Sequence, residues 1–129
     1  MLPACSFLST SCRPPRAPPE EAARVKFPLA MYTRERVVLS GGRVTAMELA
    51  LDDFLSLDAK PHKGADTTEL CLYQRESYDV IASPGPEGLT WVTVTLRPGL
   101  CEEHGLVMDM EASYAIDASR KRLVAVLND

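Results

Sequence analysis

Hydrophobic and polar residues alternate most regularly in the segment TWVTVTL at 90–96. Its aliphatic residues are Val92, Val94 and Leu96. The residues between them are Trp91, Thr93 and Thr95. Because successive side chains of a strand point to opposite faces, this pattern predicts a half-buried strand whose aliphatic face is turned toward the core.

Other segments bounded by turn-forming residues carry a weaker strand signal. Their ranges are 36–39, 69–73, 77–82, 107–116 and 122–127. Glycine, proline and polar residues dominate the stretches between them. The predicted turns and loops are 40–42, 61–68, 83–88, 97–105 and 118–121. The chain beyond the loop at 61–68 is therefore expected to be β structure.

One helix is predicted before this β region. Thr45 and Glu48 have the spacing of a capping box, in which the threonine hydroxyl accepts a backbone N–H and the glutamate reaches back to the cap. The helix should end by Lys60, because a proline follows it. Apolar residues recur at helical spacing between these ends, at Met47, Ala50, Leu51, Phe54 and Leu55.

An early helix followed by consecutive antiparallel strands is typical of an α+β fold. We expect one N-terminal amphipathic helix packed on a curved antiparallel sheet of about four to six strands, with a free edge. The expected core residues are Met47, Leu51, Phe54, Leu55, Val80, Val92, Val94, Tyr114, Ile116, Val124 and Val126.

The size and charge of the chain narrow the possible functions. Its 129 residues fit one compact domain, and the net charge of -4 does not suit a nucleic-acid-binding protein. No run approaches the roughly 18 apolar residues that a membrane-spanning helix needs. The sequence has no nucleophile elbow and no phosphate-binding glycine loop, so we expect no enzymatic activity and no cofactor.

The N-terminal segments differ from the rest of the chain in composition. Residues 1–12 carry no charged side chain, whereas 13–30 are rich in proline and charged residues. Apolar residues followed by small ones indicate the end of a secretory signal, and the proline-rich stretch is typical of an extended tether. We expect a signal end at 1–12, a tether at 13–30 and a single α+β domain at 31–129.

The sequence LSTSC, which ends at Cys12, resembles the cleavage site of a bacterial lipoprotein. In that class a peptidase cuts just before a cysteine, which then carries lipid. Ser9 and Ser11 replace the usual leucine and alanine, and no basic residue precedes the segment, so a start upstream of Met1 is required. The resemblance implies an exported protein, anchored by lipid on Cys12 in the bacterial envelope. The alternative is a cytoplasmic protein with a disordered tail.

Cysteine usage is compatible with both compartments. If Cys5 is removed with the signal and Cys12 carries lipid, Cys71 and Cys101 remain. In an oxidising compartment they could form a disulfide that stabilises the fold by about 3 kcal/mol. In a reducing compartment they would be two buried thiols.

Two groups of residues carry side chains that can bind metal ions. The first supplies the ligands that zinc prefers, in Cys71, Cys101, His62 and His104. Their spacing lacks the close pairs of structural zinc sites, so both histidines are placed in exposed loops. The second is acidic and lies on the predicted helix, at Asp52, Asp53 and Asp58. Acidic residues on the polar side of a helix usually face water, so we predict no metal.

The order of elements is similar to that of cystatin-like folds, including PepSY-like domains and NTF2-type immunity proteins. A helix is followed by YDV at 78–80, TWVTVTLRPG at 90–99, YAID at 114–117 and RLVAV at 122–126. The turn at 118–121 lacks the threonine and glycine of the PepSY pattern. Such folds host binding, inhibitory and structural roles, so the resemblance implies an architecture and not one activity.

These observations predict a non-enzymatic envelope lipoprotein with a small binding or structural domain, whose ligand is unknown. The alternative is an immunity or peptidase-inhibitor-like protein that binds a toxin or an enzyme. Because one helix covers one face of a sheet, the other face meets water or a protein partner. The candidate binding surface is Trp91, Thr93 and Thr95, although Trp91 could instead pack beneath a loop or the tether. The oligomeric state stays open.

Overall fold

The computed structural model describes residues 13–28, 36–56, 60–101 and 110–128. The chain divides into two units, Met1–Val37 and Val38–Asp129. In the first unit, residues 13–28 are exposed throughout and include one short helix, α1 (Pro19–Ala22), which begins at a proline. The predicted signal end at 1–12 lies outside the described residues, and so do the last two residues of the predicted tether.

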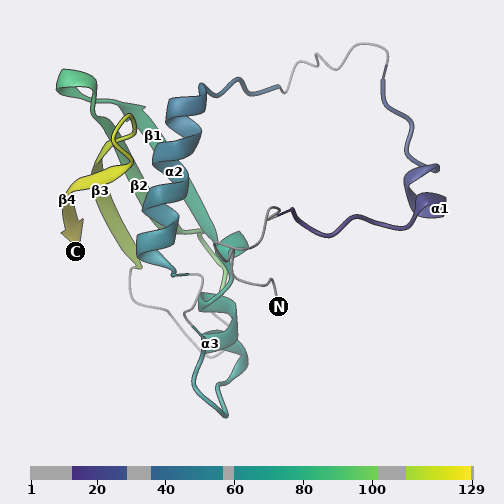
Figure 1. The fold of residues 1–129 in the computed structure, drawn as a ribbon. Coiled ribbons are helices and arrows are strands. Elements are labelled where there is room, and N and C mark those ends of the chain that lie inside the picture. Colours follow the sequence, from purple (N-terminus) through teal and green to yellow (C-terminus); the bar gives the residue numbers. More distant parts are fainter. Residues whose placement is uncertain (1–12, 29–35, 57–59, 102–109, 129) are drawn as a thin grey trace, which may run out of the picture. The chain divides into compact units, whose positions relative to one another are not determined.

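In the second unit an antiparallel sheet is combined with helices, so the predicted α+β class is confirmed. The four strands are β1 (Tyr78–Pro84), β2 (Thr90–Leu96), β3 (Glu111–Asp117) and β4 (Arg122–Asn128). They lie in the order β1-β2-β3-β4, and Figure 1 shows the helix α2 (Gly41–Phe54) beside them. Strand β2 has the predicted bounds. Strand β3 begins at Glu111; of its predicted range, residues 107–109 lie outside the described residues and Met110 is not part of the strand.

The core lies between α2 and one face of the sheet. Ala46 and Ala50, one helical turn apart, belong to the same buried cluster as Val92 and Val94 of β2. Their small side chains let the helix backbone approach the strands closely. The cluster also contains Tyr78, Ala112, Tyr114 and Ile116. Other predicted core residues are partly buried against it, namely Met47, Leu51, Phe54, Leu55 and Val80.

Three aromatic side chains, those of Phe54, Tyr78 and Tyr114, lie in this core or pack against it. The rings of Phe54 and Tyr78 meet edge to face, with centroids 5.0 Å apart. Burial raises the pKa of Tyr114 well above its usual value, and the adjacent Asp53 carboxylate, which accepts a hydrogen bond from it, adds to the shift. Asp53 therefore holds a buried hydroxyl and is not only a solvating residue.

Two residues of the predicted core, Val124 and Val126, are instead 50% and 42% exposed. Strand β4 is an edge strand, and its pairing with β3 is interrupted by a bulge. Ala115 faces Ala125, whereas Ile116 faces Leu123, which leaves Val124 without a partner. An inserted residue reverses the alternation of faces along a strand, so Leu123 packs against the core where Val124 was predicted.

Helix α2 begins earlier than predicted. Ser40 is its N-cap, and the Ser40 Oγ accepts the backbone N–H of Arg43 at 3.2 Å. Gly41 and Gly42, predicted as a turn, are the first helical residues, and Thr45 lies inside the helix. The predicted capping box is therefore wrong. A start at Ser40 adds a full turn of backbone hydrogen bonds and still satisfies a free N–H at the new end.

Helix α2 also ends earlier than predicted, at Phe54. Arg75, distant in sequence, donates to the Asp52 carboxylate at 2.7 Å and to the Leu55 carbonyl oxygen at 3.2 Å. Leu55 itself has left the helical geometry, with φ -133°. The helix thus ends where the Arg75 cation binds the carbonyl oxygen of the C-cap residue, well before Lys60. Asp58 lies outside the described residues.

The strand predicted at 69–73 is wrong, because this region is the helix α3 (Thr67–Leu72). The Asp66 carboxylate caps it by accepting the backbone N–H of Glu69 at 2.8 Å. An N-cap residue followed three positions later by glutamate is a helix-start signal. The sequence therefore contained a start signal for this helix, which the strand prediction over 69–73 did not take into account.

The strand predicted at 36–39 is also wrong, because the described residues 36–40 have no regular structure. Val37 and Val38 are 79% and 76% exposed. None of the four strands of the described sheet pairs with this segment. Without a partner strand this β-prone sequence does not form a strand, and Ser40 then begins the helix.

We expect Ser40→Ala to lower the free energy of unfolding by about 1 kcal/mol, because the Arg43 N–H loses its acceptor. Thr45→Ala, inside the helix, should leave stability unchanged or slightly raised, because alanine has the higher helix propensity. Urea unfolding of both variants is the measurement. A loss confined to Thr45→Ala would place the cap at Thr45 after all.

Candidate binding face of the sheet

We call the sheet face opposite the buried cluster the outer face. The strand register places its side chains in rows across the sheet. The first row is Ser83, Trp91, Ala115 and Ala125. The second row is Ile81, Thr93, Ser113 and Leu127. Trp91 and Thr93 of the predicted binding surface therefore lie in adjacent rows.

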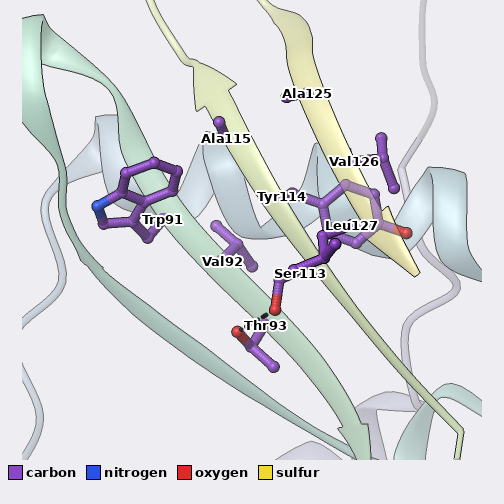
Figure 2. A pocket seen from close by; sticks show the side chains of 9 residues that line it. All are labelled: Trp91, Val92, Thr93, Ser113, Tyr114, Ala115, Ala125, Val126 and Leu127. Atoms are coloured by element: carbon purple, nitrogen blue, oxygen red, sulfur yellow. Dashed lines mark hydrogen bonds between the residues drawn. The ribbon is translucent and has the colours of Figure 1, made fainter. Parts of the chain in front are cut away.

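Three large apolar side chains are exposed on the outer face. Ile81, Trp91 and Leu127 are 59%, 46% and 64% exposed, although the water-facing side of an antiparallel sheet is usually polar. Trp91 and Leu127 border an open groove of about 520 Å³, whose floor between them has small side chains (Figure 2). An exposed apolar patch of this kind marks an interaction site more often than a bare surface.

Two hydroxyl groups give the groove its polar character. Thr93 Oγ1 and Ser113 Oγ are hydrogen-bonded at 2.9 Å, as the dashed line in Figure 2 shows. After this mutual bond the pair keeps one hydrogen and several lone pairs for a bound group. A serine acting as nucleophile needs an adjacent base, and none of the residues that line the groove supplies one. The arrangement suits binding.

Trp91 is held in place by the hairpin between β1 and β2. The Gly85 N–H donates to the Leu89 carbonyl oxygen at 2.8 Å, which closes the loop. A Cβ on Gly85 would lie 3.0 Å from the indole Nε1 of Trp91, so the ring rests against the loop backbone. The indole therefore packs beside a loop and is still nearly half exposed.

Thr95 lies on the outer face but outside the groove. It belongs to a third row, with Asp79 and Glu111. The sequence pattern found the β2 members of the outer face and missed those of the neighbouring strands, Ser113, Ala115, Ala125 and Leu127. Alternating small residues on β3 were a visible signal, but their position beside Trp91 depends on the strand register.

The turn between β3 and β4 places a cationic cluster at one end of the outer face. Asp117 accepts hydrogen bonds from Ser119 Oγ at 2.8 Å and from the Arg120 backbone N–H at 3.2 Å. Its carboxylate lies 3.8 Å from the Arg120 guanidinium and 3.6 Å from that of Arg122. The Ser119 bond, followed by the backbone bond and these cations, lowers the pKa of Asp117. At the other end Asp79 pairs with Arg97 at 3.6 Å.

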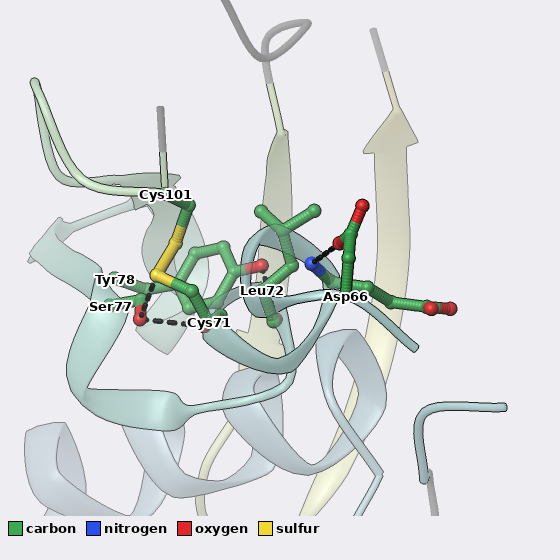
Figure 3. Close-up of a disulfide and its surroundings, with 7 residues drawn as sticks. Asp66, Cys71, Leu72, Ser77, Tyr78 and Cys101 are labelled. Atoms are coloured by element: carbon green, nitrogen blue, oxygen red, sulfur yellow. Dashed lines mark hydrogen bonds between the residues drawn. A yellow bond between two sulfur atoms is a disulfide. The ribbon is translucent and has the colours of Figure 1, made fainter. Parts of the chain in front are cut away.

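Cys71 and Cys101 form a disulfide that joins α3 to the segment after β2 (Figure 3). Their Cα atoms are 5.4 Å apart, a usual separation for this bond. Two hydroxyl groups fasten the same end of α3. Ser77 Oγ donates to the Cys71 carbonyl oxygen at 2.7 Å, and the Tyr78 hydroxyl donates to that of Leu72 at 2.7 Å. Burial raises the pKa of Tyr78, which keeps this hydroxyl a donor.

The residues weighed as zinc ligands are not brought together as a site. The two cysteine sulfur atoms are bonded to each other, so neither is a thiolate. His62 Nδ1 lies 2.6 Å from the Glu69 carboxylate at the start of α3, and His104 lies outside the described residues. In the described ranges, no cluster of three or more cysteine, histidine or acidic residues could hold a metal ion. Cys12, the predicted lipid-attachment residue, lies outside these ranges.

Comparison of the chain with protein-family models, curated proteins and solved structures gives no significant match. The resemblance to cystatin-like domains therefore stays a prediction. In the described part of the chain, no helix is long and apolar enough to cross a membrane.

Removing the disulfide should destabilise the fold. The bond closes a loop over a sequence separation of 30 residues. We expect Cys71→Ala with Cys101→Ala to lower the free energy of unfolding by about 3 to 4 kcal/mol, mainly because the unfolded chain becomes less constrained. Chemical unfolding with and without dithiothreitol is the measurement. Reductant should lower the free energy of unfolding of the wild type and leave that of the double variant unchanged. A wild type whose stability does not respond to reductant would contradict the bond.

Proposed function

We propose that this chain is a non-enzymatic binding protein of the bacterial envelope, which recognises a protein partner through the outer face around Trp91. The observation that carries the proposal is the exposed apolar groove between Trp91 and Leu127. Its hydroxyl pair can orient a bound group, and its lining offers no base for catalysis. Half-exposed tryptophan beside a hollow with a small-residue floor is typical of an interface anchor.

The free edges of the sheet are less suited to recognition than its outer face. An added strand needs a regular row of unpaired backbone groups. Strand β1 ends in Pro84, which has no N–H, and carries the charged Asp79. Strand β4 is interrupted by the bulge at Val124. Both features discourage pairing with another strand and favour side-chain recognition on the outer face.

Export and lipid attachment are the second part of the proposal. The Cys71–Cys101 disulfide supports them, because such bonds persist in oxidising compartments outside the cytosol. The exposed, proline-rich residues 13–28 suit a tether between a lipid on Cys12 and the folded domain. The domain would then meet partners within the length of the tether from the membrane surface.

The proposed architecture is cystatin-like, with α2 as the single amphipathic helix laid on a curved sheet. The shared burial of Ala46 and Ala50 with the β2 valines supports this arrangement. Such a layout covers one sheet face and leaves the other for recognition. The proposal depends on that uncovered face and not on any activity of cystatin-like proteins.

A photo-crosslinking experiment tests the recognition surface. A benzophenone amino acid replaces Leu127 on the outer face, or Glu48 on the exposed side of α2 as a matched control. After irradiation in the native host, we expect a discrete protein adduct from position 127 and none from position 48. Trp91→Ala in the same chain should remove the adduct, because the indole borders the groove. Equal adducts from both positions would refute a specific outer face.

Mass spectrometry of the protein isolated from its native host tests the anchor. We expect a mature chain that begins at Cys12 and carries the mass of a lipid group, recovered in the membrane fraction. Cys12→Ser should move the protein out of that fraction, because the apolar chain supplies the membrane affinity. An unmodified chain that retains Met1 and stays in the cytosol would refute export.

A further inference from the structure

The turn between β3 and β4 carries an excess of positive charge at one end of the groove. The β3–β4 turn presents Arg120, Lys121 and Arg122, all exposed, against the single Asp117 carboxylate. The Arg120 and Arg122 side chains are 71% and 57% exposed, so both guanidinium groups can take a further carboxylate. The chain as a whole is acidic, but charges act over only about 8 Å at physiological ionic strength. The turn is therefore locally attractive to an anion.

The distance from the groove to this turn matches the repeat of an extended chain. Ala115, on the groove floor, and Asp117, at the turn, are alternate residues of β3. Alternate residues of a strand are about 7 Å apart. An extended segment lying along β3 also presents same-side side chains every 7 Å or so. If one side chain fills the groove, the side chain two positions along reaches the turn.

The shape of the outer face favours a polypeptide segment over a small molecule. The groove is open and not an enclosed cavity, whereas small-molecule sites usually cover about 70–90% of their ligand. The face also offers a site for an acidic group, because the exposed cations of the turn lie at one of its ends.

We propose that the outer face binds an extended polypeptide segment with an apolar side chain in the groove between Trp91 and Leu127, and an acidic group two residues away at the turn formed by Arg120, Lys121 and Arg122. The inference rests on the proposed function and adds the chemical class of the partner. The Thr93 and Ser113 hydroxyls lie in the second row, where they can bond the backbone of the bound segment.

Defined peptides test this partner class. The probes are acetyl-Thr-Phe-Thr-Glu-Thr-amide and two analogues in which the glutamate is glutamine or lysine. Trp91 is the only tryptophan of the chain, so its fluorescence reports binding to the full-length protein. We expect the glutamate peptide to bind about three- to tenfold more tightly than the glutamine analogue, the range for an exposed to partly buried charge contact, and the lysine analogue to bind weakest.

Matched variants connect this preference to the turn. Arg120→Gln with Arg122→Gln should abolish the preference for glutamate and leave the affinity of the glutamine analogue unchanged. Lys60→Gln with Lys63→Gln removes the same charge elsewhere and should keep the preference. Leu127→Ala should weaken all three peptides together, because it removes one wall of the groove.

The outcomes separate this inference from the proposed function. Peptides that bind, lose affinity in Leu127→Ala and show no glutamate preference would overturn the acidic partner class and leave the outer face as the binding surface. A chain that is dimeric by light scattering, and monomeric as Leu127→Ala, would make a second copy the occupant and overturn the inference. Binding by none of the peptides up to millimolar concentration would also overturn it, while the crosslinking at position 127 decides the surface separately.

Discussion

The burial of Ala46 and Ala50 against Val92 and Val94 is the contact on which the rest of the second unit depends. Two alanines one turn apart give the helix a flat, narrow face, so its backbone lies close to the strands. A helix is about 10 Å across and four strands span about 19 Å. One helix on one side of such a sheet leaves the other face uncovered. The valines of β2 are buried in this contact. Their neighbours on the same strand, Trp91 and Thr93, are consequently turned away from the core.

A second set of contacts holds the elements that lie outside the sheet. Arg75 binds the end of α2, and the hydroxyls of Ser77 and Tyr78, together with the Cys71–Cys101 disulfide, fasten the end of α3. Small domains often rely on disulfides because they bury a limited fraction of their surface. The Arg75 bonds and the disulfide join segments that are 20 to 30 residues apart in the chain, whereas the two hydroxyl bonds span six residues. None of these contacts uses the outer face.

The outer face combines features that rarely occur together by packing alone. Its large apolar residues are exposed, and small side chains line the floor of its groove. Asp117 accepts hydrogen bonds within a turn that presents three cations beside the groove. Stability would be served equally by polar residues at Ile81 and Leu127. The exposed apolar side chains of Ile81 and Leu127 are the features on which the proposed recognition rests.

The sequence alone determined the α+β class, the limits of β2 and which of its residues face away from the core, because alternation within one strand depends on immediate neighbours. It also contained the Asp66 and Ser40 caps, which competing local signals obscured. Only the tertiary structure decided the bulge at Val124, the end of α2 and the rows that bring Ala115, Ala125 and Leu127 beside Trp91. Strand register and ion pairs between distant residues depend on groups that no local window of sequence contains, so most of the candidate site became visible only when the strands were paired.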